Sequence, residues 1–200
     1  MLQRQSFAPS SLGPAPAVKK RARPAHLPQL WLMVDARLGP ALPRIIAHLP
    51  PRSAVIVRPY AMGAALGSAH LRTIRYLARA RRHILLYAGT GQTQGYDGQH
   101  LGGGARPSGR KAGRIITMPV HDSRQAQKAR RLGVDAVLIS PIWPTRSHRG
   151  APGIGLSRFQ QLARQSGTAP IALGGMNASR FRQARRFGAM GWAGIDAFIN

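Results

Sequence analysis

The chain has 200 residues, a length that suits one domain with a substantial buried core. It contains no cysteine, which excludes disulfides, thiolate catalysis and cysteine-based metal sites. Lys and Arg number 30 against 5 acids, all of them aspartate, for a formal charge of +25. Mechanisms that need paired carboxylates or a carboxylate-rich magnesium cage therefore have few candidate residues.

The positive charge has two explanations. It suits polyanionic partners such as nucleic acid or phosphorylated metabolites. An Arg-, Ala-, Gly- and Pro-rich composition of the kind a GC-rich genome encodes explains it equally well. Since the sequence has no RNP-like aromatic motif, helix-turn-helix or zinc finger, we expect any nucleic-acid binding to be non-specific. No run of 18 apolar residues or secretory segment occurs, so we expect a cytoplasmic protein without a membrane partner.

The predicted elements begin after a tail. Residues 1–28 are rich in Pro, Ser and basic residues and lack a period that could bury a face, so we expect them to be disordered. Residues 29–200 alternate short apolar runs, typical of strands covered on both faces, with amphipathic helical stretches. The expected strands are Leu30–Val34, Ala54–Arg58, His83–Tyr87, Gly98–His100, Arg114–Met118, Ala136–Ile139, Pro170–Leu173 and Gly191–Ile195. The expected helices are Pro43–His48, Ser68–Arg82, Ser123–Leu132, Leu156–Gln165 and Ala178–Phe187.

Eight strands with intervening helices in about 170 residues predict an α/β fold, a small (β/α)8 TIM barrel. The alternative, a doubly wound sheet, would place a G-x-G-x-x-G turn after the first strand, where the chain has D-A-R-L-G at residues 35–39. In a TIM barrel the functional groups lie in the loops that follow the strands, so the candidate site residues come from these loops.

Gly174 and Gly175 follow the seventh strand and lead into a helix. Glycines there let backbone N–H groups approach an anion, and the helix N-terminus adds positive potential, so we predict a phosphate site. The alternative is a tight turn that needs glycine only for steric reasons. Thr145 and Ser147, in the Pro- and Gly-rich loop after the sixth strand, supply hydroxyl donors for phosphate oxygens. That loop is either a mobile lid or an ordinary basic surface loop.

Two histidines end strands. His121 comes just after the fifth strand, where a histidine can transfer protons near neutral pH. The alternative is that Asp122 caps the next helix and His121 has no role in chemistry. His100 ends the fourth strand, and a buried, hydrogen-bonded histidine is the favoured interpretation for it.

Four segments resemble the thiamine phosphate synthase and TenI family, in the family's order and spacing. They are D-G-Q-H-L-G at 97–102, G-V-D-A-V-L-I-S-P-I-W-P-T at 133–145, P-I-A-L-G-G-M at 170–176 and G-A-M-G-W-A-G-I at 188–195. The resemblance implies a barrel of thiamine biosynthesis that binds a thiazole phosphate, and it adds Arg58 and Ile195 to the substrate-binding residues. The family's synthases couple this thiazole to a pyrimidine diphosphate with magnesium, whereas its TenI-like members tautomerise the thiazole without metal.

Several positions depart from the synthase pattern. Of its Gln-x-Arg-x-Lys after strand two only Arg58 is present, and the loop after Thr145 lacks its lysine. The magnesium-binding aspartates fall at residues 88–89 and near Ala105, so the resemblance implies that the magnesium ligands are lost and that no cofactor is used. The Ser-Val-His motif of TenI-like members reads Pro-Val-His here, at residues 119–121, so His121 is retained and the serine is not. Asp196 stands where the family has serine, and a carboxylate there repels a phosphate unless an arginine pairs with it.

The favoured interpretation is a metal-free, TenI-like thiazole tautomerase with His121 as the proton shuttle. The residues expected to hold its phosphorylated substrate are Arg58, Thr145, Ser147, Gly174, Gly175 and Ile195. Two alternatives stay open: a thiamine phosphate synthase, and a degenerate barrel that binds a phosphorylated ligand without catalysis. A homo-oligomer is compatible with all three.

Overall fold

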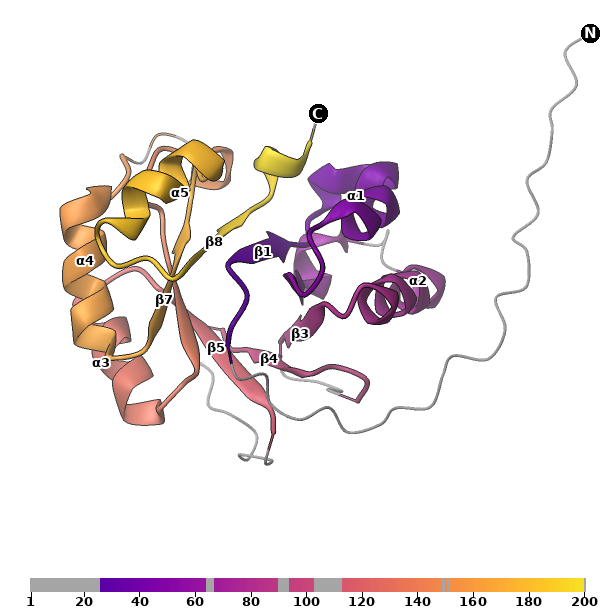
Figure 1. Ribbon diagram of the computed structural model, residues 1–200, viewed down its shortest axis with the longest axis horizontal. Coiled ribbons are helices and arrows are strands. Elements are labelled where there is room, and N and C mark those ends of the chain that lie inside the picture. The colour runs from indigo at the N-terminus through magenta and orange to yellow at the C-terminus, as the bar shows by residue number, and fades with distance from the viewer. Residues whose placement is uncertain are drawn as a thin grey trace, which may run out of the picture.

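The computed structural model describes residues 26–63, 67–89, 94–102, 113–148, 150 and 152–199. Its strands are all parallel and close into a barrel in sequence order, with β8 beside β1 (Figure 1). The strands are β1 Leu30–Met33, β2 Ala54–Val57, β3 Ile84–Ala88, β4 Gly98–His100, β5 Ile115–Val120, β6 Ala136–Ile139, β7 Ala169–Leu173 and β8 Gly191–Gly194. The prediction of a TIM barrel is therefore confirmed, with strand ends displaced by at most two residues.

Helices cover the barrel from outside. The α-helices are α1 Leu42–His48, α2 Ser68–Ala80, α3 Ser123–Leu132, α4 Gly155–Ser166 and α5 Ala178–Arg185. Helices α1 and α2 lie on one side of the barrel, and α3, α4 and α5 lie on the other (Figure 1). Among the described residues, no helix flanks β4, and residues 90–93 and 103–112 on either side of it lie outside the description.

The strands are buried because both of their faces are covered. Every residue of β2 and β6 is buried, one face toward the helices and the other toward the barrel interior. Local signals set the helix ends. The carboxylate of Asp122 accepts a hydrogen bond from the N–H of Gln125 and so caps α3. Gly133 and Gly167 adopt left-handed conformations that end α3 and α4.

The predicted tail, residues 1–28, lies outside the described residues as far as residue 25. Its last residues contact the barrel: the indole N–H of Trp31 donates to the carbonyl of Pro28 at 2.6 Å, and Leu27 packs against the core. The N–H of Trp192 in β8 donates to the carbonyl of Gln29. These contacts extend the packed chain slightly before residue 29.

Two aspartates fasten the N-terminal ends of neighbouring strands. Before β4, a carboxylate oxygen of Asp97 accepts the N–H of Leu85 at 2.8 Å, and the N–H of Asp97 donates to the carbonyl of Leu85. Before β6, Asp135 makes the same pair of bonds with Ile116, both at 2.7 Å. Both aspartates belong to the segments that resemble the family, and both lie at the end of the barrel opposite the functional loops.

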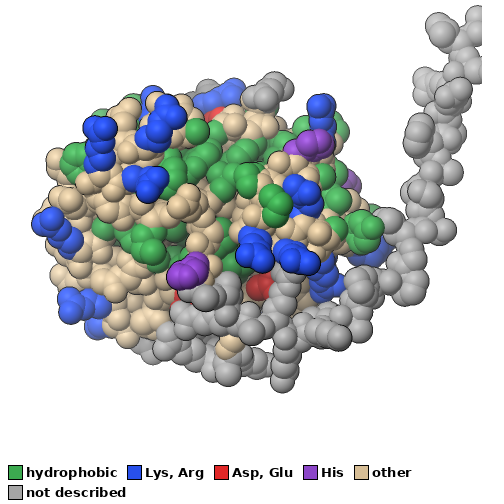
Figure 2. Space-filling view, in the orientation of Figure 1, with side chains coloured by type: hydrophobic (Ala, Val, Ile, Leu, Met, Phe, Trp, Pro, Cys, Tyr) green, Lys and Arg blue, Asp and Glu red, His purple; other side chains and the backbone are tan. Residues whose placement is uncertain are grey.

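Basic side chains are spread over several elements on the face shown in Figure 2, with very little acidic surface beside them. This dispersal is what a compositional bias predicts, whereas a nucleic-acid interface would gather them in one stripe. Non-specific nucleic-acid binding stays a prediction. No helix in the described part of the chain has the length and apolar character needed to cross a membrane. The cytoplasmic location also stays a prediction.

Candidate functional site

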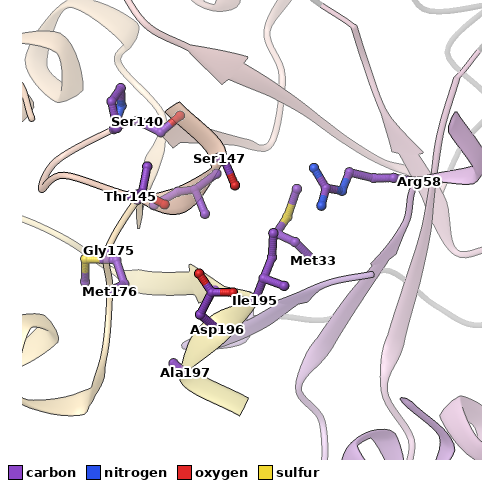
Figure 3. Close-up of a pocket in the computed structure, with 14 residues that line it drawn as sticks. Met33, Arg58, Ser140, Thr145, Ser147, Gly175, Met176, Ile195, Asp196 and Ala197 are labelled. Atoms are coloured by element: carbon purple, nitrogen blue, oxygen red, sulfur yellow. The ribbon is translucent and has the colours of Figure 1, made fainter. Parts of the chain in front are cut away.

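A cavity opens at the C-terminal end of the barrel, among the loops that follow the strands (Figure 3). All six of the predicted phosphate-binding residues line it: Arg58, Thr145, Ser147, Gly174, Gly175 and Ile195. Residues without an assigned role also line it, including Met33 of β1, Ser140 after β6 and Met176 after β7. Whether these residues bind phosphate stays a prediction, but the fold does bring them to one place.

The glycine turn after β7 is packed tightly against the loop after β6. A Cβ on Gly174 would lie 2.6 Å from Cα of Pro141, and one on Gly175 would lie 2.7 Å from the carbonyl oxygen of Pro144. Both glycines have positive φ angles, 94° and 61°. The steric explanation for these glycines therefore holds at both positions. It does not exclude an anion, because the turn still forms a wall of the cavity.

The loop after β6 is tied at both ends. The N–H of Ile154 donates to the carbonyl of Pro141 at 2.8 Å, and the N–H of Gly155 donates to that of Ile142 at 3.1 Å. A Cβ on Gly153 would lie 2.2 Å from the carbonyl oxygen of Ile142, so this closure requires glycine. These hydrogen bonds fix the two ends of the loop, and Thr145 between them lines the cavity. A role of the loop as a mobile lid stays a prediction.

An ion-pair cluster of four residues crosses the mouth. Arg37 donates from Nε to Asp35 at 3.0 Å and from Nη1 to both carboxylate oxygens of Asp196, at 3.0 and 3.1 Å. Its Nη2 also donates to the hydroxyl of Ser147 at 2.8 Å. Arg58 donates to the other oxygen of Asp35 at 2.8 Å. The arginine that Asp196 requires beside a phosphate is therefore present, and it comes from the loop after β1.

The cluster stabilises the charged forms of Asp35 and Arg37. Burial raises the pKa of Asp35, but the hydrogen bonds from Arg37 and the charges of Arg37 and Arg58 outweigh it, so the pKa lies below its usual value. The hydrogen bond to Asp35 in turn raises the pKa of Arg37. Two guanidinium and two carboxylate groups thus face one another at neutral pH, and the cluster carries no net charge.

His121 lies at the end of β5, exposed and outside the residues that line the cavity. Its Nδ1 is 2.8 Å from the carbonyl oxygen of Ser140 and 3.4 Å from the hydroxyl of the same residue. Because a carbonyl oxygen can only accept, Nδ1 of the neutral ring carries the hydrogen and Nε2 is the basic nitrogen. Ser140 is buried and lines the cavity, so the histidine contacts a residue of the cavity wall without lining the cavity itself.

His100 is buried at the end of β4, where its Nδ1 lies 2.9 Å from the hydroxyl of Thr117. Burial, and to a lesser degree the charge of Arg58, lowers the pKa of His100 to about 3. The ring is therefore buried and hydrogen-bonded, as favoured from the sequence.

The residues present do not fit a magnesium ion. At the end of β3 the chain has Ala88 and Gly89, and the carbonyl of Gly89 accepts a hydrogen bond from Gln99. The carboxylates that do reach the mouth, Asp35 and Asp196, are held by arginines. Nowhere in the described ranges do three or more His, Asp or Glu residues gather as a metal site would require. Ala105 lies outside the described residues.

Sequence reasoning assigned no role to Asp35, Arg37, Met33 or Ser140. Of these, Asp35 and Arg37 have a signal in the sequence, because they form the D-A-R that directly follows the first strand. Because the functional groups of a barrel follow its strands, charged residues at that position are candidates for the site in the same way as Asp196.

Comparisons with known proteins agree with this architecture. Over 85 residues the chain is 32% identical to a protein of Aquifex aeolicus (strain VF5) provisionally named thiamine-phosphate synthase 2. That match covers 42% of this chain and 46% of the relative, so the chain spans about half of the relative's length. Thiamine phosphate pyrophosphorylase from Pyrococcus furiosus has a TM-score of 0.64 at 21% identity, covering 84% of this chain and 86% of that one.

A second solved structure, 3-hexulose-6-phosphate synthase, has a TM-score of 0.60 at 14% identity, with 84% of this chain and 90% of that chain covered. Two different activities on similar barrels mean that these likenesses support the fold alone. The protein-family comparison is more specific: the model described as thiamine monophosphate synthase matches residues 58–198, well over half of the chain. The protein therefore belongs to the thiamine monophosphate synthase family, as a divergent member.

Proposed function

We propose that the protein binds a thiazole phosphate in the mouth of its barrel and interconverts thiazole tautomers without a metal ion, with His121 moving the proton. The observation that carries this proposal is the position of Ser140. Its carbonyl orients the ring of His121, while the residue itself lines the cavity. The contact of the His121 ring with a residue of the cavity wall supports a proton-transferring role for it.

The cavity offers suitable groups for a phosphate. Thr145 and Ser147 present hydroxyls from the loop after β6, and the turn at Gly174 and Gly175 presents backbone. Ile195 lies on the neighbouring loop after β8, and the corner between the seventh and eighth strands is the frequent phosphate site of TIM barrels. These groups support a single phosphate at that corner.

A tautomerisation removes a proton at one ring position and returns it at another, so it needs one group that accepts and then donates. Nε2 of His121 is suited to that task because Nδ1 is occupied by the Ser140 carbonyl. The ring of the ligand has to extend from the phosphate corner past Ser140 to reach Nε2. No step in this scheme passes through a metal, in keeping with the poor fit of the mouth residues to magnesium.

The second candidate is the coupling of a pyrimidine diphosphate to the thiazole phosphate, the activity for which the family is named. Arg58 favours it, since it lines the cavity at the position where the synthase pattern has an arginine. Against it, Arg58 is paired with Asp35, and Ile56 and Tyr60 stand where that pattern has Gln and Lys.

The test compares His121→Ala with His48→Ala. His48 is a matched control, because it is exposed on α1 and its Nδ1 also lies 2.8 Å from a carbonyl, that of Arg44. We expect His121→Ala to lower thiazole tautomerisation by roughly 10²–10⁴-fold, the usual contribution of a general acid–base group, with phosphate affinity unchanged. His48→Ala should behave as the wild type.

Three results would reject the proposal. If the wild type binds the thiazole phosphate but does not tautomerise it, the protein is a non-catalytic, ligand-binding barrel. Formation of thiamine phosphate from both substrates with magnesium establishes the synthase. Full tautomerase activity of His121→Ala removes His121 from the mechanism.

A further inference from the structure

The carboxylate of Asp196 is out of place beside a phosphate corner. It lines the cavity next to Ile195 (Figure 3), and the glycine turn after β7 lines the same cavity. Its side chain is 34% exposed, so solvent screens its charge only in part. An unpaired carboxylate in this position would repel the ligand that the corner is built to hold.

Arg37 removes that obstacle by binding both oxygens of Asp196. The same guanidinium holds Asp35 and the hydroxyl of Ser147, so it joins the loops after β1, β6 and β8 across the mouth. Its donors are therefore already engaged. Arg58, the other arginine of the cluster, donates to Asp35 and to the carbonyl of Val34.

We infer that this cluster makes Arg37 a specificity-determining residue, which lets the site accept a ligand with one phosphate group and discriminates against a diphosphate. The inference rests on the proposed phosphate corner. A second phosphoryl group would need a cation of its own, and neither arginine of the cluster could supply it unless Arg37 left Asp196 or Arg58 left Asp35. The first exchange leaves the partly buried carboxylate of Asp196 unpaired next to the incoming negative charge, and the second leaves Asp35 with Arg37 as its one ion-pair partner in the cluster.

The test measures binding of inorganic phosphate and of pyrophosphate by titration calorimetry, in magnesium-free buffer with a chelator. In the wild type we expect pyrophosphate to bind no more tightly than phosphate. Asp196→Asn releases Arg37 from one carboxylate. This variant should bind pyrophosphate about ten-fold more tightly relative to phosphate, a change in affinity that corresponds to one charge-assisted hydrogen bond.

Removing the arginine instead of the carboxylate tests the ion pair between Arg37 and Asp196. Arg37→Gln leaves Asp196 unpaired and should weaken phosphate binding about ten-fold, and adding Asp196→Asn to it should restore most of the loss. Asp122→Asn is the matched control: it removes a negative charge from the same end of the barrel, keeps a residue that caps helices well and does not contact Arg37. Melting temperatures identify any variant that fails to fold.

The outcomes separate the two proposals. Failure of the wild type to bind phosphate at all overturns both the phosphate corner and this inference. Tight pyrophosphate binding by the wild type, or a preference that Asp196→Asn leaves unchanged, overturns the inference alone. The same holds if the double variant binds phosphate as weakly as Arg37→Gln.

Discussion

The buried ring of His100 makes a prediction about stability at mildly acidic pH. Burial lowers the pKa of His100 to about 3, against a usual value of 6.5. Below pH 6.5 the unfolded chain therefore binds a proton at this ring, whereas the folded chain does not. The stability associated with the neutral ring is fully present above the unfolded pKa, and it is lost progressively as the pH falls toward the folded pKa.

The size of the effect follows from linkage. Each pH unit between those two values lowers the free energy of unfolding by about 1.4 kcal/mol, so a fall from pH 6.5 to pH 5 costs about 2 kcal/mol. His100→Asn keeps a polar group toward the hydroxyl of Thr117 but removes the titrating ring. The variant loses packing at every pH, yet it should lose less additional stability on acidification.

Urea unfolding of both proteins at about pH 7.5, 6 and 5 measures this difference. The gap between the wild type and His100→Asn should narrow by about 2 kcal/mol from the highest to the lowest pH. His48→Asn, exposed on α1, is the control and should run parallel to the wild type. Parallel curves for His100→Asn would refute the reasoning, as would a proton NMR titration that places the His100 midpoint near 6.5.

Three further results are expected. Magnesium should change neither the melting temperature nor the phosphate affinity beyond an ionic-strength effect, because arginines hold the carboxylates of the mouth; a magnesium-specific rise would contradict this. Gly174→Ala should lower the free energy of unfolding, measured with urea, by about 3 kcal/mol, because the added Cβ would lie 2.6 Å from Cα of Pro141. Gly102→Ala should leave the free energy of unfolding nearly unchanged, because a Cβ there has open space around it. Binding to duplex DNA, measured by fluorescence anisotropy, should fall steeply between about 50 and 200 mM salt whatever the sequence; selectivity that survives the higher salt would indicate a specific interface.

Features that depend on neighbours in the sequence could be predicted. The continuous apolar runs at 54–57 and 136–139 mark buried strands without further information. Asp122 caps α3 through Gln125, three residues away, so its structural role can be predicted from its neighbours in the sequence. The number of strands and the missing G-x-G-x-x-G turn after the first strand then favour the barrel over a doubly wound sheet.

Features that depend on distant contacts could not. Arg37 and Asp196 are 159 residues apart, and only the closure of β8 against β1 brings them together. The position of His121 shows the same limit: the sequence places it at a strand end but not on which side of Ser140 its ring lies. The glycines after β7 remain ambiguous for a different reason, since a tight packing contact and an anion site both require a residue without a Cβ.

The segments that resemble the family contain residues that line the cavity and residues that join neighbouring strands. These two kinds of residue lie at opposite ends of the barrel. Gly174 and Thr145 line the cavity, whereas Asp97 and Asp135 lie before β4 and β6 at the opposite end. The aspartates of the resemblance therefore support the fold and not the chemistry. A divergent member can keep them while its site changes.

This separation makes the last prediction. Asp135→Ala would leave the N–H of Ile116 unpaired in a buried position, and Asp97→Ala would do the same to Leu85. An unpaired buried donor costs about 1–3 kcal/mol, so each variant should lose about 2 kcal/mol in the free energy of unfolding. Phosphate affinity at a temperature where the variants are folded should not change, because the cavity lies at the other end of the strands. A variant that keeps its stability but loses phosphate binding would show that these aspartates serve the site, and the division of the resemblance between fold and chemistry would be wrong.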